Sequence, residues 1–173
     1  MPTLYDDGGP NGTLERINKG TLIEGQDSYK TKPLFLSGSA GLITTPTDFL
    51  RFAQMLLNGG ELDGVRILSP KTVDLMTSDL LGDLPVRGAI LPGYGFGYGV
   101  EVNRGPAKTA TIGSAGEFNW TGAFGTLFFV DPKEQLIGIF MMQDMMQSRL
   151  SFDAMWQFKR MVYQAIVEEE KPH

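Results

Sequence analysis

Two amphipathic helices with clear start signals are predicted in the first half of the chain. The first is expected over 45–57, with Thr45 as its N-cap, Pro46 as its first residue and Asn58-Gly59-Gly60 as its end. Its apolar residues recur with helical spacing and predict one buried face, made of Phe49, Phe52, Ala53 and Leu56. A second, shorter helix is expected from Pro70 to about Ser78, capped by Ser69 and stapled by Leu68 against Val73.

A third helix is predicted to start near Ser151. Its buried stripe is expected to consist of apolar residues only, namely Phe152, Met155, Trp156, Val162 and Ile166.

Strands are predicted between the second and third helices. In 93–102, GYGFGYGVEV, glycine alternates with aromatic residues; this period of two predicts a strand whose glycines admit a close backbone or a ligand. Further strands are expected over 107–113, 117–122, 124–131 and 135–142, with a hairpin turn at Asp131-Pro132-Lys133-Glu134. The last two are apolar on both faces, so both faces should be covered.

This order of elements predicts an α+β fold in which helices flank an antiparallel β-sheet. Residues 1–33 lack a sustained apolar period and are predicted to form an irregular cover segment. Residues 34–173 are predicted to form the remaining domain.

Composition narrows the possible functions. The chain has 173 residues, 15 basic and 20 acidic side chains and a net charge of −5, with the basic residues scattered, which disfavours nucleic-acid binding. No apolar run is long enough for a membrane span. Cysteine is absent, and the one histidine, His173, ends the chain, so a Ser-His-Asp triad or a histidine or thiolate metal site is not expected from it. No cofactor or metal is expected, and the compartment is left open.

The segment 116–126, GEFNWTGAFGT, is the main candidate for chemistry. From the residues alone, Trp120, Thr121 and Gly122 have two interpretations: the wall of a catalytic cleft, or the close-packed start of a buried strand.

The residues from SGSAGLITTPTDFLRFAQMLLNGG through GYGFGYGV to GEFNWTGAFGTLFFVDPKEQLIGIFMMQ resemble the carboxyl-terminal part of the β-lactamase-related serine hydrolases. This superfamily includes class C β-lactamases, penicillin-binding D,D-peptidases and esterases of the same fold. The resemblance covers about residues 34–167 and implies a partial β-lactamase/transpeptidase-like fold. It is specific for the superfamily and weak for the substrate.

The resemblance gives the Trp-Thr-Gly segment a role. In the family, a Lys-Thr-Gly motif or a variant of it lies on an edge strand beside the nucleophile, and Trp120-Thr121-Gly122 matches that element. The resemblance then implies that the N–H of Ala123 is one of two oxyanion donors, that Gly122 keeps this approach clear, and that Thr121 and Trp120 contact substrate. Indole cannot pair with a substrate carboxylate as lysine does, which favours a neutral small-molecule ester or amide.

The other two family motifs are absent. No serine is followed three residues later by lysine, and no tyrosine is followed two residues later by asparagine. The chain is therefore expected to be a later portion of a serine hydrolase, inactive alone, that lacks the nucleophile. It is expected to bind the missing amino-terminal segment through the 135–143 strand, or to self-associate there. Two alternatives stay open: a non-catalytic ligand- or peptide-binding module, and an inactive fragment.

Overall fold

The computed structural model describes residues 5–6, 15–16, 42–84, 91–144 and 149–167. The elements of the first half are two β-hairpins and two helices: β1 (Tyr5–Asp6), β2 (Glu15–Arg16), α1 (Pro46–Leu57), β3 (Glu61–Leu62), β4 (Val65–Arg66) and α2 (Pro70–Met76). The second half holds the main sheet and two helices: β5 (Tyr94–Phe96), β6 (Glu101–Asn103), α3 (Pro106–Thr109), β7 (Phe118–Gly122), β8 (Thr126–Asp131), β9 (Leu136–Phe140) and α4 (Arg149–Gln164). Apart from β1 and β2, the predicted cover segment 1–33 lies outside the described residues.

The predicted caps of α1 and α2 are confirmed. The Thr45 hydroxyl accepts a hydrogen bond from the Asp48 amide at 3.1 Å, and the Ser69 hydroxyl accepts one from the Thr72 amide at 3.0 Å. Each hydroxyl thereby satisfies one of the amides that the first helical turn leaves without an intrahelical partner. The prediction that Phe52 is buried is wrong, because the buried face of α1 is made of Ala53, Met55 and Leu56.

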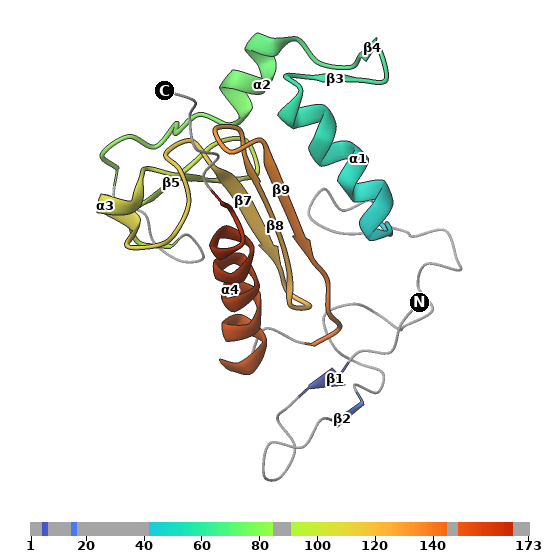
Figure 1. The fold of residues 1–173 in the computed structure, drawn as a ribbon, viewed down its shortest axis with the longest axis vertical. Helices are drawn as coiled ribbons and strands as arrows, with labels where there is room; N and C mark the ends of the chain where they lie inside the picture. The colour runs from blue at the N-terminus through green and yellow to red at the C-terminus, as the bar shows by residue number, and fades with distance from the viewer. Residues whose placement is uncertain (1–4, 7–14, 17–41, 85–90, 145–148, 168–173) are drawn as a thin grey trace.

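The main sheet has five antiparallel strands in the order β5-β6-β7-β8-β9. The predicted hairpin turn between β8 and β9 is confirmed, and the Asp131 carboxylate accepts hydrogen bonds from the amides of Lys133 at 3.0 Å and Glu134 at 3.3 Å. The longest paired strands are β7, β8 and β9, which Figure 1 shows side by side at the centre of the molecule.

The segment 93–102 forms two paired strands, β5 and β6, and not the single strand that its period of two predicts. A loop over 97–100 reverses the chain, closed by a hydrogen bond from the Gly97 amide to the Val100 carbonyl at 2.9 Å. The expectation of close backbone approach is confirmed at Gly93 and Gly97, whereas a Cβ on Gly95 would meet the Asp79 side chain and one on Gly99 would meet nothing within 4 Å. A Cβ built on Gly97 would lie 2.1 Å from the Met76 carbonyl oxygen, a distance that no side chain could occupy.

The predicted strand over 107–113 is wrong, since part of this segment belongs to the short helix α3. Pro106 stands at the first helical position, where its fixed φ and missing N–H favour a helix start. The helix ends at Ala110, which has a left-handed φ of 51°. Lys108 therefore lies on this helix, where it is exposed, and not on a strand.

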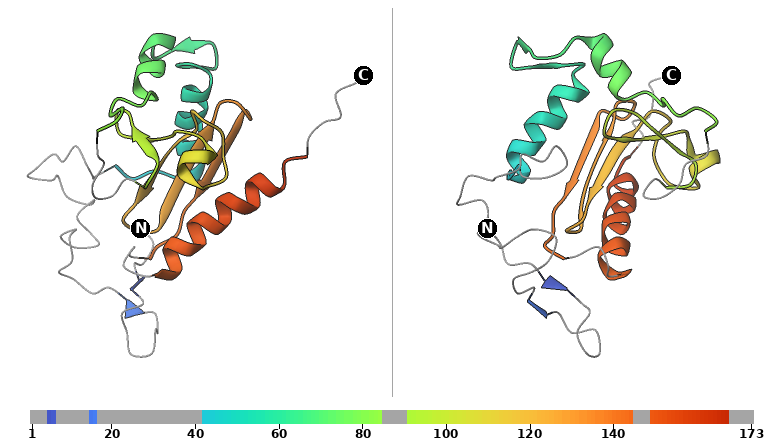
Figure 2. Two further views of the ribbon diagram at one scale, coloured as in Figure 1. Left: turned by 90° about the vertical axis from the view of Figure 1, so that its left-hand side faces the viewer. Right: turned by 180° about the vertical axis from the view of Figure 1, so that it is seen from behind.

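Both faces of the sheet are covered, as the apolar character of β8 and β9 predicts (Figure 2). On one face α1 packs on a core that includes Phe118 and Val130. On the other face α4 packs on a core that includes Leu127 and Phe129. Successive residues of β7 and β8 therefore serve the two cores in turn.

The helix α4 begins at Arg149, two residues before the predicted start, and its buried stripe differs from the predicted one. Met155 and Trp156 are buried as expected, but Phe152 and Ile166 are exposed. The stripe instead continues through two polar side chains, Lys159 and Tyr163. Among the described residues, no helix has the length and apolar character needed to cross a bilayer.

Candidate functional site

The Trp-Thr-Gly segment forms the second half of β7. This strand pairs with β8 along its whole length, from Phe118 opposite Val130 to Gly122 opposite Thr126. Its pairing with β6 on the other side covers only Phe118 and Asn119. The strand is therefore internal to the sheet, and the expectation that Trp120-Thr121-Gly122 lies on an edge strand is wrong. Residues 120–122 have a ladder partner only in β8 among the described strands.

Trp120 and Thr121 point to opposite faces of the sheet, because successive side chains of a strand alternate. The half-buried indole of Trp120 lies opposite Phe128 and contacts the ring of Phe96 edge to face, with ring centroids 5.2 Å apart and planes inclined at 73°. Thr121 lies opposite Leu127 and is also half-buried. Of the two, Trp120 is therefore the residue held by a second aromatic side chain.

Ala123 lies just past β7, in the turn that leads into β8, and is exposed. The turn is closed by a hydrogen bond from the Gly125 amide to the Gly122 carbonyl at 3.1 Å. No ladder pair includes Ala123, so pairing in the described sheet does not occupy its amide. Gly122 has a packing reason to lack a side chain, because a Cβ there would lie 2.2 Å from the Thr126 hydroxyl.

A buried network of charged side chains lies under the opposite end of β7. The Lys159 ammonium is 2.5 Å from Oε1 of Glu117, the residue just before β7, and both side chains are almost fully buried. The Tyr163 hydroxyl is within hydrogen-bond distance of Glu117 Oε2 at 2.9 Å and of Asp131 Oδ2 at 2.7 Å. One hydroxyl hydrogen is therefore shared between two carboxyl groups.

Burial determines the direction of the pKa shifts in this network. It raises the pKa of Glu117, against the opposing effect of Lys159, and lowers the pKa of Lys159, against the opposing effect of Glu117. Burial also raises the pKa of Tyr163. A buried Glu101 accepts a hydrogen bond from the Leu91 amide at 2.8 Å, and its pKa is likewise raised by burial. The hydrogen bonds of the network join α4 to the start of β7 and to the end of β8.

This network was not predicted from the sequence. Its signal was available in α4, where Trp156, Lys159 and Tyr163 follow one another at spacings of three and four residues, so that a lysine interrupts the apolar stripe. A lysine on the buried face of a helix needs either a buried acidic partner or room to extend its ammonium group to solvent. Neither partner, Glu117 nor Asp131, could be chosen from spacing, because both come from distant turns.

A pocket of about 410 Å³ opens beside α4. Residues 110–112 and Leu91 form one wall, while Phe152, Trp156 and Arg160 of α4 form part of the other. None of Trp120, Thr121, Gly122 and Ala123 lines this pocket. It is therefore separate from the candidate site on β7.

Comparison with known proteins identifies the family. The family model for β-lactamase matches residues 3–156. An uncharacterized protein of Mycobacterium tuberculosis is 41% identical over 123 residues, which cover 66% of this chain and 31% of that protein. A putative D-alanyl-D-alanine carboxypeptidase of Escherichia coli O157:H7 is 31% identical over 100 residues, which cover 56% of this chain and 21% of that protein. The chain thus spans less than a third of these relatives.

Solved structures show the same partial fold. EstCE1, a hydrolase with promiscuous acyltransferase activity, superposes with a TM-score of 0.75 and 26% identity, covering 93% of this chain and 43% of that protein. Simvastatin synthase (LovD) from Aspergillus terreus has a TM-score of 0.74 at 16% identity, which covers 96% of this chain and 43% of that protein and shows the fold alone. The match of the family model over most of the chain, together with this fold, shows that the chain belongs to the β-lactamase family and forms part of a β-lactamase-like fold.

Proposed function

We propose that this chain supplies the substrate-facing strand of a serine acyl hydrolase that acts on neutral esters or amides. The observation that carries the proposal is the one-sided strand pairing of β7 at Trp120-Thr121-Gly122. This segment has a ladder partner on one side only, and it leads directly into the exposed turn residue Ala123. Backbone amides without ladder partners can bind a developing oxyanion.

The reaction would proceed through a covalent acyl-enzyme. A serine hydroxyl from polypeptide outside this chain attacks the substrate carbonyl carbon, and its proton passes through a general base to the leaving alcohol or amine as the bond to that group breaks. Water then attacks the acyl-enzyme, releases the acid and returns a proton to the serine. The amide of Ala123 would donate to the carbonyl oxygen when it becomes negatively charged, together with the amide of the serine itself.

Trp120 supports a neutral substrate. An indole presents an apolar face and one N–H donor, so it offers no positive charge to a substrate carboxylate. Thr121 would place its hydroxyl beside the reacting group as a hydrogen-bond partner. EstCE1 is a hydrolase with promiscuous acyltransferase activity, and the Escherichia coli relative is a putative D-alanyl-D-alanine carboxypeptidase; both descriptions support the proposal of an acyl hydrolase.

The nucleophilic serine and the general base would come from further polypeptide of the same protein. When that polypeptide is absent, the chain would associate with a second copy of itself. The strand β9 lies at the end of the described sheet and presents apolar residues on both faces. A strand edge with unpaired backbone groups favours the addition of another strand. The small part of each relative that this chain covers supports a partner of this kind.

The test uses a fluorophosphonate probe, which labels an activated serine. The full-length protein is expected to be labelled and to hydrolyse p-nitrophenyl butyrate, whereas the present chain alone does neither. Ala123→Pro removes the proposed donor N–H and is expected to lower kcat about 100-fold. Ala123→Ser retains the N–H and serves as the matched control.

Failure of both readouts in the full-length protein would reject the hydrolase and favour a non-catalytic ligand- or peptide-binding module, or an inactive fragment. Equal effects of Ala123→Pro and Ala123→Ser would reject the role of this amide. Near-UV circular dichroism of each variant shows whether the site is still folded.

A further inference from the structure

An ion pair between Asp79 and Arg104 lies apart from the candidate site on β7. It links the loop between α2 and β5, which contains Asp79, to the end of β6, which Arg104 follows. Arg104 Nε donates to Asp79 Oδ2 at 2.7 Å, and the other end of the guanidinium donates to the Gly82 carbonyl. The second oxygen of Asp79 accepts from the Leu81 amide at 3.0 Å. About four fifths of the Arg104 side chain and three quarters of the Asp79 side chain are covered, since their exposed fractions are 20% and 25%. Every oxygen and two donor nitrogens of the pair are thus engaged.

This ion pair holds its segment directly against β5. The Leu80 amide donates to the Phe96 carbonyl at 3.0 Å, and the Tyr98 amide donates to the Met76 carbonyl at 2.9 Å. The approach is so close that a Cβ on Gly95 would lie 2.2 Å from Cγ of Asp79. The backbone on both sides of Phe96 is therefore fixed by residues 76–82.

Phe96 in turn contacts Trp120, with the edge-to-face geometry already described. Aromatic pairs in this arrangement favour one relative orientation, because the positive edge of one ring meets the negative face of the other. A shift of the Phe96 backbone would therefore change the position of the Trp120 ring. The path from ion pair to indole passes through one hydrogen bond, one residue and one ring contact.

We propose that the Asp79–Arg104 ion pair positions Trp120, through the backbone of β5 and the ring of Phe96, and thereby determines which apolar acyl groups the site accepts. Asp79 and Arg104 are positioning residues, since they act through Phe96. The selectivity part rests on the proposed hydrolase function, whereas the positioning part does not.

The geometry favours a flat apolar acyl group, such as an aromatic or unsaturated one. The indole of Trp120 offers a flat contact surface for a flat acyl group. Because the ring is already held in one orientation, binding costs little additional side-chain entropy. A short, flexible acyl group such as acetyl covers little of that surface. Loss of the ion pair should therefore affect the larger, flat acyl group more than the short one.

The pair is suited to hold its geometry over a wide pH range. Burial alone would raise the pKa of Asp79, but the hydrogen bond and charge of Arg104 outweigh it and hold this pKa below its usual value. The carboxylate therefore stays charged at all but acid pH. This contribution to stability is present above the ordinary pKa of aspartate and is lost only as the pH falls through the lowered value.

The first experiment measures Trp120 directly and needs no activity. The chain has two tryptophans, so Trp156→Phe leaves Trp120 as the only one. In this chain with this background, Arg104→Gln is expected to shift the fluorescence maximum to longer wavelength and to increase quenching by acrylamide. Arg104→Lys, which keeps the charge, is expected to give a smaller shift than Arg104→Gln.

The matched control is Arg51→Gln, which breaks an exposed ion pair at 2.6 Å between α1 and Asp63 of the β3–β4 hairpin. This variant is expected to leave Trp120 emission unchanged. Should Arg104→Gln fold poorly, Asp79→Asn removes the same charge pair and keeps an oxygen for the Leu81 amide. Unchanged emission in a folded Arg104→Gln or Asp79→Asn protein overturns the positioning role.

The second experiment compares p-nitrophenyl acetate with p-nitrophenyl cinnamate. Arg104→Gln is expected to lower kcat/KM for the cinnamate about tenfold more than for the acetate. An equal loss for both esters overturns the selectivity claim even if the emission shifts. Absence of hydrolysis by the full-length parent protein rejects the proposed function and the selectivity with it, and the emission result then decides the positioning of Trp120 by itself.

Discussion

Lys159 on α4 and Glu117 at the start of β7 form a buried ion pair, with the ammonium 2.5 Å from the carboxylate and only 1% and 0% of the two side chains exposed. The pair joins the last helix to the centre of the sheet. Removing one member of a buried pair leaves the other charge without compensation, which is more harmful than losing both.

Lys159→Met is therefore expected to lower the free energy of unfolding by about 3–5 kcal/mol. Methionine replaces the length of the side chain but leaves the Glu117 carboxyl group without its cation. Urea unfolding followed by circular dichroism measures the change. Lys71→Met, at a lysine that is almost fully exposed, is the control and should change stability by less than about 0.5 kcal/mol.

The double variant Lys159→Met/Glu117→Gln tests the cause. If the loss comes from an uncompensated charge, neutralising Glu117 should recover part of it. The explanation would be contradicted if the double variant were less stable than Lys159→Met by as much as Glu117→Gln alone destabilises the parent chain.

Stability should fall with rising pH because of Glu101. Burial raises its pKa above the ordinary glutamate value, so the folded state holds this proton more tightly than the unfolded state does. The resulting stabilisation is complete below the unfolded-state pKa of about 4.5 and is lost as the pH rises through the raised value. Each pKa unit of difference is worth about 1.4 kcal/mol.

Glu101→Gln keeps an oxygen for the Leu91 amide and cannot ionise. We expect this variant to be as stable as the parent near pH 4 and more stable at pH 7, as measured by urea unfolding across this range. The same substitution at the exposed Glu134 is the control and should change the stability at pH 7 by less than about 0.5 kcal/mol. A parent protein and Glu101→Gln variant with parallel stability curves would refute a raised pKa.

Trp120→Lys should change the charge preference of the proposed hydrolase. A lysine in the first position of the motif provides a cation for a substrate carboxylate, and such a charge-assisted hydrogen bond is worth roughly 1.5–3 kcal/mol. In the full-length protein, the ratio of kcat/KM for the anionic β-lactam nitrocefin to that for neutral p-nitrophenyl butyrate is expected to rise at least about tenfold. Trp120→Leu, which adds no charge, is the control and should leave the ratio low.

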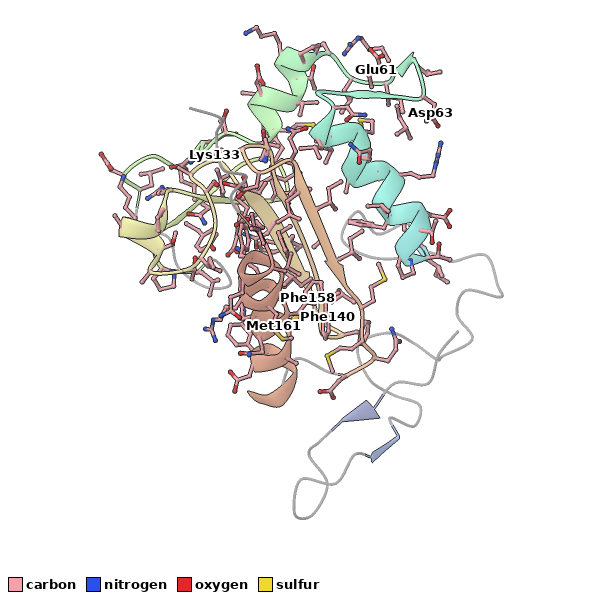
Figure 3. All side chains as sticks on the ribbon, in the orientation of Figure 1. Glu61, Asp63, Lys133, Phe140, Phe158 and Met161 are labelled. Carbon is pink, nitrogen blue, oxygen red and sulfur yellow. The ribbon has the colours of Figure 1, made fainter. Side chains whose placement is uncertain are left out.

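The edge of β9, which pairs only with β8 among the described strands, should promote association of the chain. Figure 3 shows Phe140 of β9 beside Phe158 and Met161 of α4, and the rings of Phe140 and Phe158 lie 5.3 Å apart. Met141, which follows β9, is 37% exposed. Met141→Lys places a charge at this edge and should shift the chain toward monomer in size-exclusion chromatography with light scattering.

Val65→Lys is the control for this experiment, since Val65 is also an exposed apolar residue but lies on the β3–β4 hairpin. It should leave the association unchanged. A parent chain that is already a well-folded monomer, and that binds no further polypeptide of the same protein, would argue against the role of β9 as a docking edge.

Local signals in the sequence predicted several elements correctly. Thr45-Pro46 and Ser69-Pro70 specify helix starts through hydrogen bonds within one turn, so distant residues are not needed to recognise them. Asp131-Pro132 likewise predicts the hairpin turn before β9. The α+β class follows from the order of such elements, and the resemblance carried by several runs within residues 34–167, Trp120-Thr121-Gly122 among them, led to the family. The boundary at 33/34 stays a prediction, although the family match extends to residue 3.

The tertiary structure decided what depends on contacts between distant segments. The sequence showed alternating glycines in 93–102, but only the packing of residues 76–79 explains Gly95 and Gly97, and only the strand pairing shows a hairpin there. Likewise, Lys159 is buried in a stripe predicted to be apolar because Glu117, from a distant part of the sequence, meets it in space. Burying a charge is favourable only with its partner in place, and that partner is a property of the fold and not of local sequence.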